Sequence, residues 1–122
     1  MLRLGQTHAT LRVVSDQIGT PTYTLDLARL LVDMIETEKY GIYHVTNEGG
    51  YISWYDFACE IFHQTGLPVT VQPVTTAEYG LSKAIRPFNS RLDKTKLTKS
   101  GFVSLPHWRD ALRRYLEAIR KE

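Results

Sequence analysis

The spacing of apolar and polar positions predicts two long helices, over residues 24–41 and 108–119. In both ranges apolar residues recur at intervals of three and four, which is typical of helices with one buried face. In the first range the expected buried stripe consists of Leu27, Leu30, Leu31, Met34 and Ile35. We expect Thr24 to cap this helix, Asp26 to interact favourably with its positive end, and Gly41 to end it.

A further amphipathic helix is predicted after Ser53. The run from Ser53 to Asp56 has the pattern of a capping box, in which the hydroxyl and the carboxylate each accept a hydrogen bond from a backbone N–H. Gly66 is expected to end this helix. The expected apolar face comprises Trp54, Phe57, Ala58, Ile61 and Phe62. Core anchors, rather than platforms for stacking a ligand, are expected at Trp54, Phe57 and Trp108.

Short extended runs are predicted at residues 11–14, 42–46 and 69–74. A loop is expected between the first run and the first long helix, a turn at residues 47–50, and short helices after Thr76 and over residues 92–97. Residues 1–5 have the pattern of a helix end capped by Gly5, which suggests that something precedes them. Because helices alternate with strands, we expect an α/β arrangement with parallel pairing. Three short strands make a thin sheet, which favours a part of something larger.

The composition is that of one globular domain. The 122 residues are 43% hydrophobic and 23% charged, enough apolar surface for a single core. No apolar run approaches the roughly 20 residues that span a bilayer, and no secretory signal is recognisable. The single cysteine, Cys59, excludes an internal disulfide and favours a reducing cytoplasm. We therefore expect residues 1–122 to be one cytoplasmic domain.

Positive charge is concentrated in the last third of the chain. Residues 1–82 contain four Lys/Arg and nine Asp/Glu, whereas residues 83–122 contain eleven Lys/Arg and four Asp/Glu. This asymmetry fits an anionic partner such as a phosphate, a diphosphate or a nucleic acid, and equally fits a solvated basic helix face. Of these, a nucleic-acid reader has the weakest support, because no aromatic-and-basic strand motif and no paired-helix reader is recognisable.

Patterns that signal catalysis or metal binding are missing from the sequence. The eight glycines form no Gly-x-Gly-x-x-Gly run, and there is neither a Walker-type loop nor a Gly-x-Ser-x-Gly elbow. Cys59 and His63 lie one helical turn apart, but no second pair completes a metal site. Tyr79 and Lys83 fit the Tyr-x-x-x-Lys pair of short-chain dehydrogenases without the surrounding strand, Ser/Thr and cofactor turn. We therefore expect no catalytic, cofactor-binding or metal-binding residue in this chain.

Five segments, in order and at matching spacings, resemble the second half of dTDP-4-dehydrorhamnose reductases, which are extended short-chain dehydrogenases. The longest is VVSDQIGTPTYTLDLA at residues 13–28. The others are residues 40–49, 53–58, 86–90 and 105–109, so the resemblance covers nearly all 122 residues. It implies the C-terminal substrate-binding portion of a Rossmann-type parent, with few, short, mostly parallel strands and about four helices. The resemblance also implies that the N-terminal half, which binds the cofactor and carries the catalytic Thr/Tyr/Lys set in the family, is not part of these 122 residues.

The resemblance also implies a function. The parent would reduce dTDP-4-dehydro-L-rhamnose to dTDP-L-rhamnose with NADPH or NADH, and this chain alone is expected to be inactive. Arg86 falls where family members present a guanidinium to the nucleotide diphosphate. Asp16 and Gln17 are expected near the substrate, although an Asx-type turn is an equally weighted interpretation of Asp16. Thr22 and Tyr23 lie at a helix entrance whose free amides could meet an anion.

The expected partners are a dTDP-linked deoxyhexose and the missing Rossmann half. No nucleic acid or membrane is expected, while a homodimer of the parent and a metal at its interface stay open. The alternative hypothesis is a free-standing module without catalysis that binds a nucleotide sugar or docks onto a partner reductase.

Overall fold

The chain passes back and forth between two structural units. Unit 1 comprises Met1–Gly19 and Tyr51–Ser90, and unit 2 comprises Thr20–Gly50 and Arg91–Glu122. The computed structural model describes residues 1–80 and 84–120. Helices and strands are interspersed along these residues, and the longest strands are parallel, so the expected α/β class is confirmed. None of the helices in the described residues has the length and hydropathy needed to cross a membrane.

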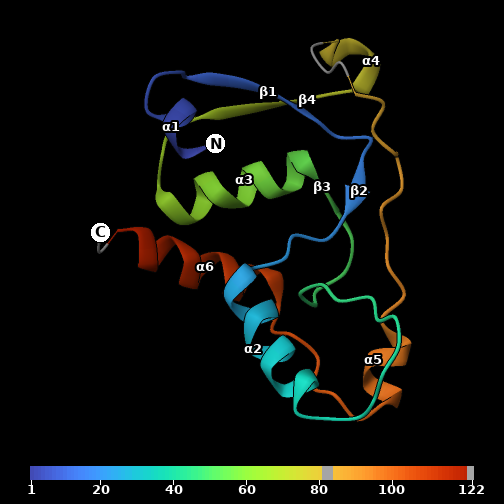
Figure 1. Cartoon of the computed structure of the whole chain (residues 1–122). Helices are drawn as coiled ribbons and strands as arrows, with labels where there is room; N and C mark the ends of the chain where they lie inside the picture. Colours follow the sequence, from blue (N-terminus) through green and yellow to red (C-terminus); the bar gives the residue numbers. More distant parts are fainter. Residues whose placement is uncertain (81–83, 121–122) are drawn as a thin grey trace. The chain divides into compact units, whose positions relative to one another are not determined.

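Unit 1 is built on two parallel strands and one long helix. β1 (Thr10–Val14) and β4 (Thr70–Val74) pair in register, from Thr10 opposite Thr70 to Val14 opposite Val74. α3 (Trp54–Thr65) packs along this pair (Figure 1), with the short helix α1 (Leu2–Gly5) beside it. The buried apolar side chains of the unit are Val13, Ala58, Ile61, Phe62 and Val74. α4 (Thr76–Tyr79) follows β4 directly.

The ends of α3 follow the local sequence signals. The Ser53 hydroxyl accepts a hydrogen bond from the Asp56 N–H at 3.0 Å, and the Asp56 carboxylate accepts one from the Ser53 N–H at 2.9 Å. Gly66 ends the helix with a φ of 69°. The predicted cap at Gly5 is wrong, because Gln6 ends α1 in a right-handed conformation. A Cβ on Gly5 would lie 2.6 Å from the Phe62 ring, so this glycine permits close packing of α1 on α3.

A second, minimal sheet forms where the sequence predicted only a loop. β2 (Ile18–Gly19) pairs antiparallel with β3 (Ile52–Ser53). On its other side, the Ile18 N–H donates to the Phe88 carbonyl at 2.9 Å, and the Ser90 N–H donates to the Ile18 carbonyl at 2.8 Å. These pairings join residues far apart in the chain, and two-residue strands leave no periodic pattern to recognise.

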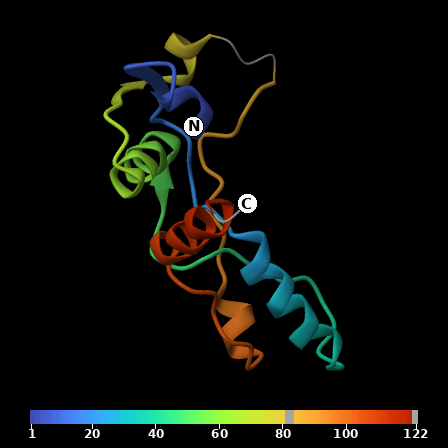
Figure 2. The ribbon, with the colours of Figure 1, turned by 90° about the vertical axis from the view of Figure 1, so that its left-hand side faces the viewer.

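Unit 2 contains three helices and a small apolar core. The helices are α2 (Thr24–Ile35), α5 (Thr95–Lys99) and α6 (Trp108–Ile119), and the bounds predicted for the last helix are confirmed. The first turn of α2 lies beside α6 in both views (Figure 1 and Figure 2). The core cluster is formed by Leu30, Leu97, Phe102 and Leu105, with Met34, Tyr43 and Val45 packed against it.

Three predictions for α2 are wrong. α2 ends at Ile35 rather than near Gly41, and Tyr23 rather than Thr24 is its N-cap. Leu30 is the only buried member of the expected stripe, whereas Leu31 is 50% and Ile35 80% exposed.

Residues 42–46 also differ from the prediction, because no described segment pairs with them as a strand. Tyr43 and Val45 pack against the core, whereas Ile42, the residue before Tyr43, is 83% exposed. An irregular segment that alternates between core and solvent therefore produced a strand-like pattern.

Candidate functional site

The candidate site lies where β1 and β4 end. The carboxyl ends of parallel strands meet at one edge of a sheet, and ligands of α/β proteins bind outside that edge. β1 is followed by Ser15, Asp16 and Gln17, and β4 by Thr75 and Thr76. The Ser15 N–H donates to the Val74 carbonyl at 2.9 Å, which holds the two loops together. Two predicted site residues, Asp16 and Gln17, therefore lie at the edge where a ligand is expected.

Asp16 is an ionised acceptor tied to the second loop. Its carboxylate accepts the Thr76 N–H at 2.9 and 3.0 Å and the Thr76 hydroxyl at 2.6 Å. The hydroxyl bond, followed by the backbone N–H bond, lowers the pKa of Asp16 below its ordinary value. The main partner of Asp16 thus lies sixty residues away, which distinguishes it from the Asx-type turn considered as an alternative.

Thr76 also contacts the second predicted residue. The Gln17 side-chain nitrogen Nε2 donates to Thr76 Oγ1 at 3.1 Å, and both side chains are half-buried. Thr76 is the first residue of α4, whose N-cap Thr75 forms a capping box with Glu78. The Thr-x-x-Glu pattern signals that helix start, but nothing local in the sequence shows that Thr76 joins Asp16 to Gln17.

Arg86 belongs to the same unit and lies on an exposed segment. The backbone of this segment is fixed two residues further on, where Phe88 and Ser90 bond to Ile18 of β2. Arg86 is exposed, and the structure shows no hydrogen bond from its guanidinium to a described residue. A planar guanidinium in this state can bind two oxygens of a phosphate at once.

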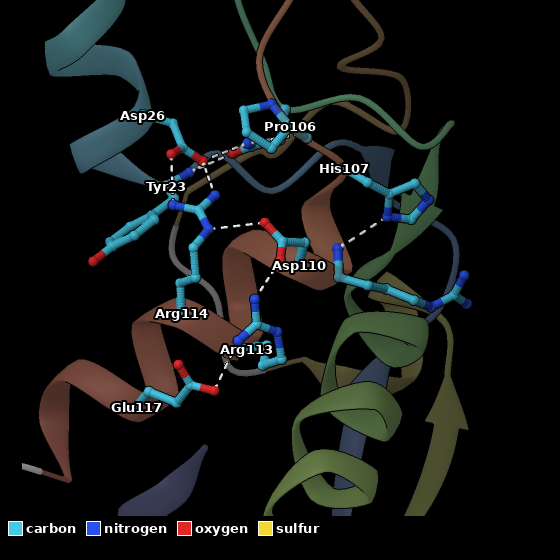
Figure 3. Close-up of polar contacts among 10 residues, drawn as sticks. Tyr23, Asp26, Pro106, His107, Asp110, Arg113, Arg114 and Glu117 are labelled. Atoms are coloured by element: carbon cyan, nitrogen blue, oxygen red, sulfur yellow. Dashed lines mark hydrogen bonds and ion pairs between the residues drawn. The ribbon is translucent and has the colours of Figure 1, made fainter.

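Thr22 belongs to unit 2. A buried polar network around Asp26 and Asn47 fixes the backbone of Tyr23, the residue that follows Thr22. Arg114 binds the Asp26 carboxylate through Nη1 and Nη2, each at 2.7 Å (Figure 3). Asn47 Nδ2 donates to the same carboxylate at 2.8 Å. The Arg114 hydrogen bond is the main reason why the pKa of Asp26 is lowered. Asp26 is 4% exposed and Asn47 is fully buried.

Asn47 extends this network to two loops. Its Oδ1 accepts the Tyr23 N–H at 2.7 Å, and its Nδ2 also donates to the Pro106 carbonyl at 2.9 Å. The backbone next to Thr22 is thereby fixed. Free backbone amides were predicted at the start of this helix. For Tyr23 the prediction is wrong, because its N–H already donates a hydrogen bond to Asn47 Oδ1.

The remaining sequence candidates do not form a second site. Tyr79 ends α4, and Lys83 lies outside the described residues. Cys59 is half-buried, and no group of three or more His, Cys, Asp or Glu able to hold a metal occurs in residues 1–80 and 84–120. Trp108, 2% exposed, is confirmed as a buried anchor. Trp54 is 55% exposed, so its prediction as a core anchor is wrong: it lies in the first turn of α3, ahead of the buried positions.

Comparison with known proteins identifies the family. Residues 1–121 match the family model described as the RmlD substrate binding domain. This chain belongs to the RmlD substrate binding domain family. It is 47% identical over 96% of its length to the spore coat polysaccharide biosynthesis protein SpsK of Bacillus subtilis, and 42% identical over 93% to a dTDP-4-dehydrorhamnose reductase of Aggregatibacter actinomycetemcomitans. It spans only 40% and 42% of the length of these two relatives.

Solved structures agree with the family assignment. A crystal structure of a dTDP-4-dehydrorhamnose reductase from Clostridium acetobutylicum matches 98% of this RmlD-family chain with a TM-score of 0.92 and 42% identity. The corresponding reductase from Bacillus anthracis, in complex with NADP, matches 99% with a TM-score of 0.87 and 38% identity. This chain covers 42% and 41% of those two proteins. The resemblance found in the sequence is therefore confirmed.

Proposed function

We propose that residues 1–122 are the substrate-binding domain of a dTDP-4-dehydrorhamnose reductase. The longer protein would reduce dTDP-4-dehydro-L-rhamnose to dTDP-L-rhamnose with NADPH or NADH, in the cytoplasm. The observation that carries this proposal is the family match over residues 1–121. Support comes from relatives of that name and from the NADP complex of the Bacillus anthracis reductase.

The residues of this chain do not fit a nicotinamide dinucleotide. A dinucleotide pyrophosphate is bound by a glycine-rich turn after a parallel strand. Here the loops that follow β1 and β4 begin with Ser15-Asp16-Gln17 and Thr75-Thr76, without glycine. We therefore assign no cofactor contact to this chain and propose that it does not catalyse reduction alone. Its partners would be the remainder of the longer protein and a dTDP-linked deoxyhexose.

Within this domain Arg86 is proposed to bind the diphosphate. Its guanidinium is exposed and without a described protein partner, while the backbone beyond it is fixed to β2. Asp16 and Gln17 are proposed to form the floor of the sugar-nucleotide site at the ends of β1 and β4. Thr22, next to the backbone fixed by Asn47, is proposed as a further substrate contact.

The proposal is tested by calorimetric titration of the chain with dTDP-L-rhamnose. A hydrogen bond to a charged group contributes about 1.5–3 kcal/mol, so Arg86→Ala should weaken binding about tenfold or more. Arg86→Lys should restore only part of the loss, because an ammonium lacks the planar pair of donors. Arg3→Ala, which removes the same charge from an exposed position in unit 1, is the matched control and should bind like the wild type.

Equal affinities of the wild type and Arg86→Ala would contradict the diphosphate role of Arg86. A folded wild-type chain that binds no dTDP-L-rhamnose would contradict the proposed function of this chain as a binding domain in its own right.

A further inference from the structure

The hydrogen bonds at the ends of β1 and β4 have a fixed direction. Ionised Asp16 can only accept, and it receives both the N–H and the hydroxyl proton of Thr76. The hydroxyl contact, at 2.6 Å, is a short charge-assisted bond. A threonine hydroxyl has one proton, so this bond leaves Thr76 Oγ1 with lone pairs only.

This constraint fixes the orientation of the neighbouring amide. Gln17 approaches Thr76 Oγ1 at 3.1 Å, and an oxygen without a free proton can only accept from it. The reversed amide would place two acceptor oxygens in contact with no proton between them. The network itself therefore requires that the Gln17 NH₂ group faces Thr76.

The opposite end of the amide, Gln17 Oε1, is left as the free group. The structure shows no hydrogen bond from a described residue to this oxygen, and the side chain is only half-buried. It carries two acceptor lone pairs held in one direction by Thr76 and Asp16.

We propose that Gln17 selects the ligand by accepting a hydrogen bond at Oε1 from a neutral donor, and that Thr76 and Asp16 are positioning residues that fix this acceptor. The inference rests on the proposed function. In a nucleoside-diphosphate sugar the donor is a sugar hydroxyl or the ring N–H of a pyrimidine base. A keto oxygen, which can only accept, is disfavoured at this position, because it would leave two acceptors facing each other.

The orientation of the amide is tested without any ligand. In ¹⁵N-labelled chain, one side-chain amide proton of Gln17 should be hydrogen-bonded, with a shifted resonance and slowed exchange. Thr76→Val removes the hydroxyl but keeps the N–H that binds Asp16, so this signature should be lost in a folded protein. Thr70→Val makes the same chemical change at the other end of β4 and should leave it unchanged. A Gln17 amide signal that is the same in the wild type and Thr76→Val overturns the positioning role.

The recognition role is tested by titration with dTDP-L-rhamnose and with dTDP. Loss of one neutral hydrogen bond corresponds to about a 2–13-fold change in affinity, so Gln17→Met should weaken binding by roughly that factor. Thr76→Val should weaken it less, and the double variant should bind like Gln17→Met, because Thr76 acts through Gln17. Weakening toward both ligands indicates the base N–H as donor, and weakening toward the sugar nucleotide alone indicates a hydroxyl.

The outcomes separate this inference from the function on which it rests. Wild-type affinity in Gln17→Met overturns recognition by Gln17, and a further loss in the double variant overturns the action of Thr76 through it. If the wild type binds neither ligand, the proposed function fails together with the recognition role. The ligand-free amide measurement still decides whether Thr76 fixes Gln17.

Discussion

Replacing Arg114 by methionine probes the ion pair between Arg114 and the buried Asp26 in unit 2. The Asp26 side chain is 3% exposed and is held by both terminal nitrogens of Arg114 (Figure 3). Arg114→Met retains a long helix-forming side chain but leaves Asp26 buried with Asn47 as its remaining side-chain donor. The variant also removes the 2.8 Å ion pair between Arg114 and Asp110, but Asp110 is 41% exposed and keeps Arg113 as a partner, so most of the expected loss comes from the buried Asp26.

The expected loss of unfolding free energy follows from the burial of the Asp26 carboxylate. Removing one partner of a buried ion pair costs about 3–5 kcal/mol, because the other charge stays desolvated. The Arg114 side chain is 25% exposed, so solvent can reach part of the site, and we expect about 3 kcal/mol. Arg113, one residue earlier, pairs with Asp110 and Glu117, and all three side chains are 41–54% exposed. Arg113→Met should cost less than about 1 kcal/mol.

Urea unfolding followed by tryptophan fluorescence measures this difference. Trp108 is 2% exposed in unit 2, and a Trp54→Phe background removes the exposed tryptophan of unit 1. In that background Arg114→Met should lose about 3 kcal/mol of unfolding free energy and Arg113→Met less than about 1 kcal/mol. Equal effects of the two substitutions, or a cost below about 1 kcal/mol for Arg114→Met, would refute the argument from burial.

Two further results are expected. The lowered pKa of Asp26 makes its contribution to stability complete above the unfolded value of about 3.9 and lost as pH falls through the lower folded value. Between pH 5 and pH 2 the urea midpoint should therefore fall more steeply for the wild type than for Asp26→Asn. Gly49→Ala should lose about 1 kcal/mol or more beyond Gly50→Ala in the same assay. Both glycines have positive φ, but a Cβ on Gly49 would collide with the His107 ring, whereas nothing lies within 4 Å at Gly50; equal losses would contradict this.

The features that sequence reasoning predicted well depend on neighbouring residues. The capping box of Ser53 and Asp56, the end of α3 at Gly66 and the bounds of α6 are all encoded within one or two helical turns. The parallel arrangement followed from the alternation of strands and helices, and the structure confirms it for β1 and β4. These signals placed Asp16 and Gln17 directly after a strand.

The features that were missed depend on distant residues. Asp26 has the pattern of a residue that interacts with the positive end of a helix, and its burial depends on Arg114, eighty-eight residues away. The strand predicted at residues 42–46 failed because alternation alone does not supply a partner strand. Thr76 was missed as a site residue for the same reason: its contacts with Asp16 and Gln17 span about sixty residues.

The central claim, that this chain binds a nucleotide sugar at the ends of β1 and β4, is tested most directly by backbone amide shifts. A ¹H–¹⁵N titration of the chain with dTDP-L-rhamnose should shift the resonances of residues 15–19, 75–76 and 84–90, and Arg86→Ala should reduce the shifts at equal ligand concentration. Shifts confined to other segments, such as α5, would contradict the account.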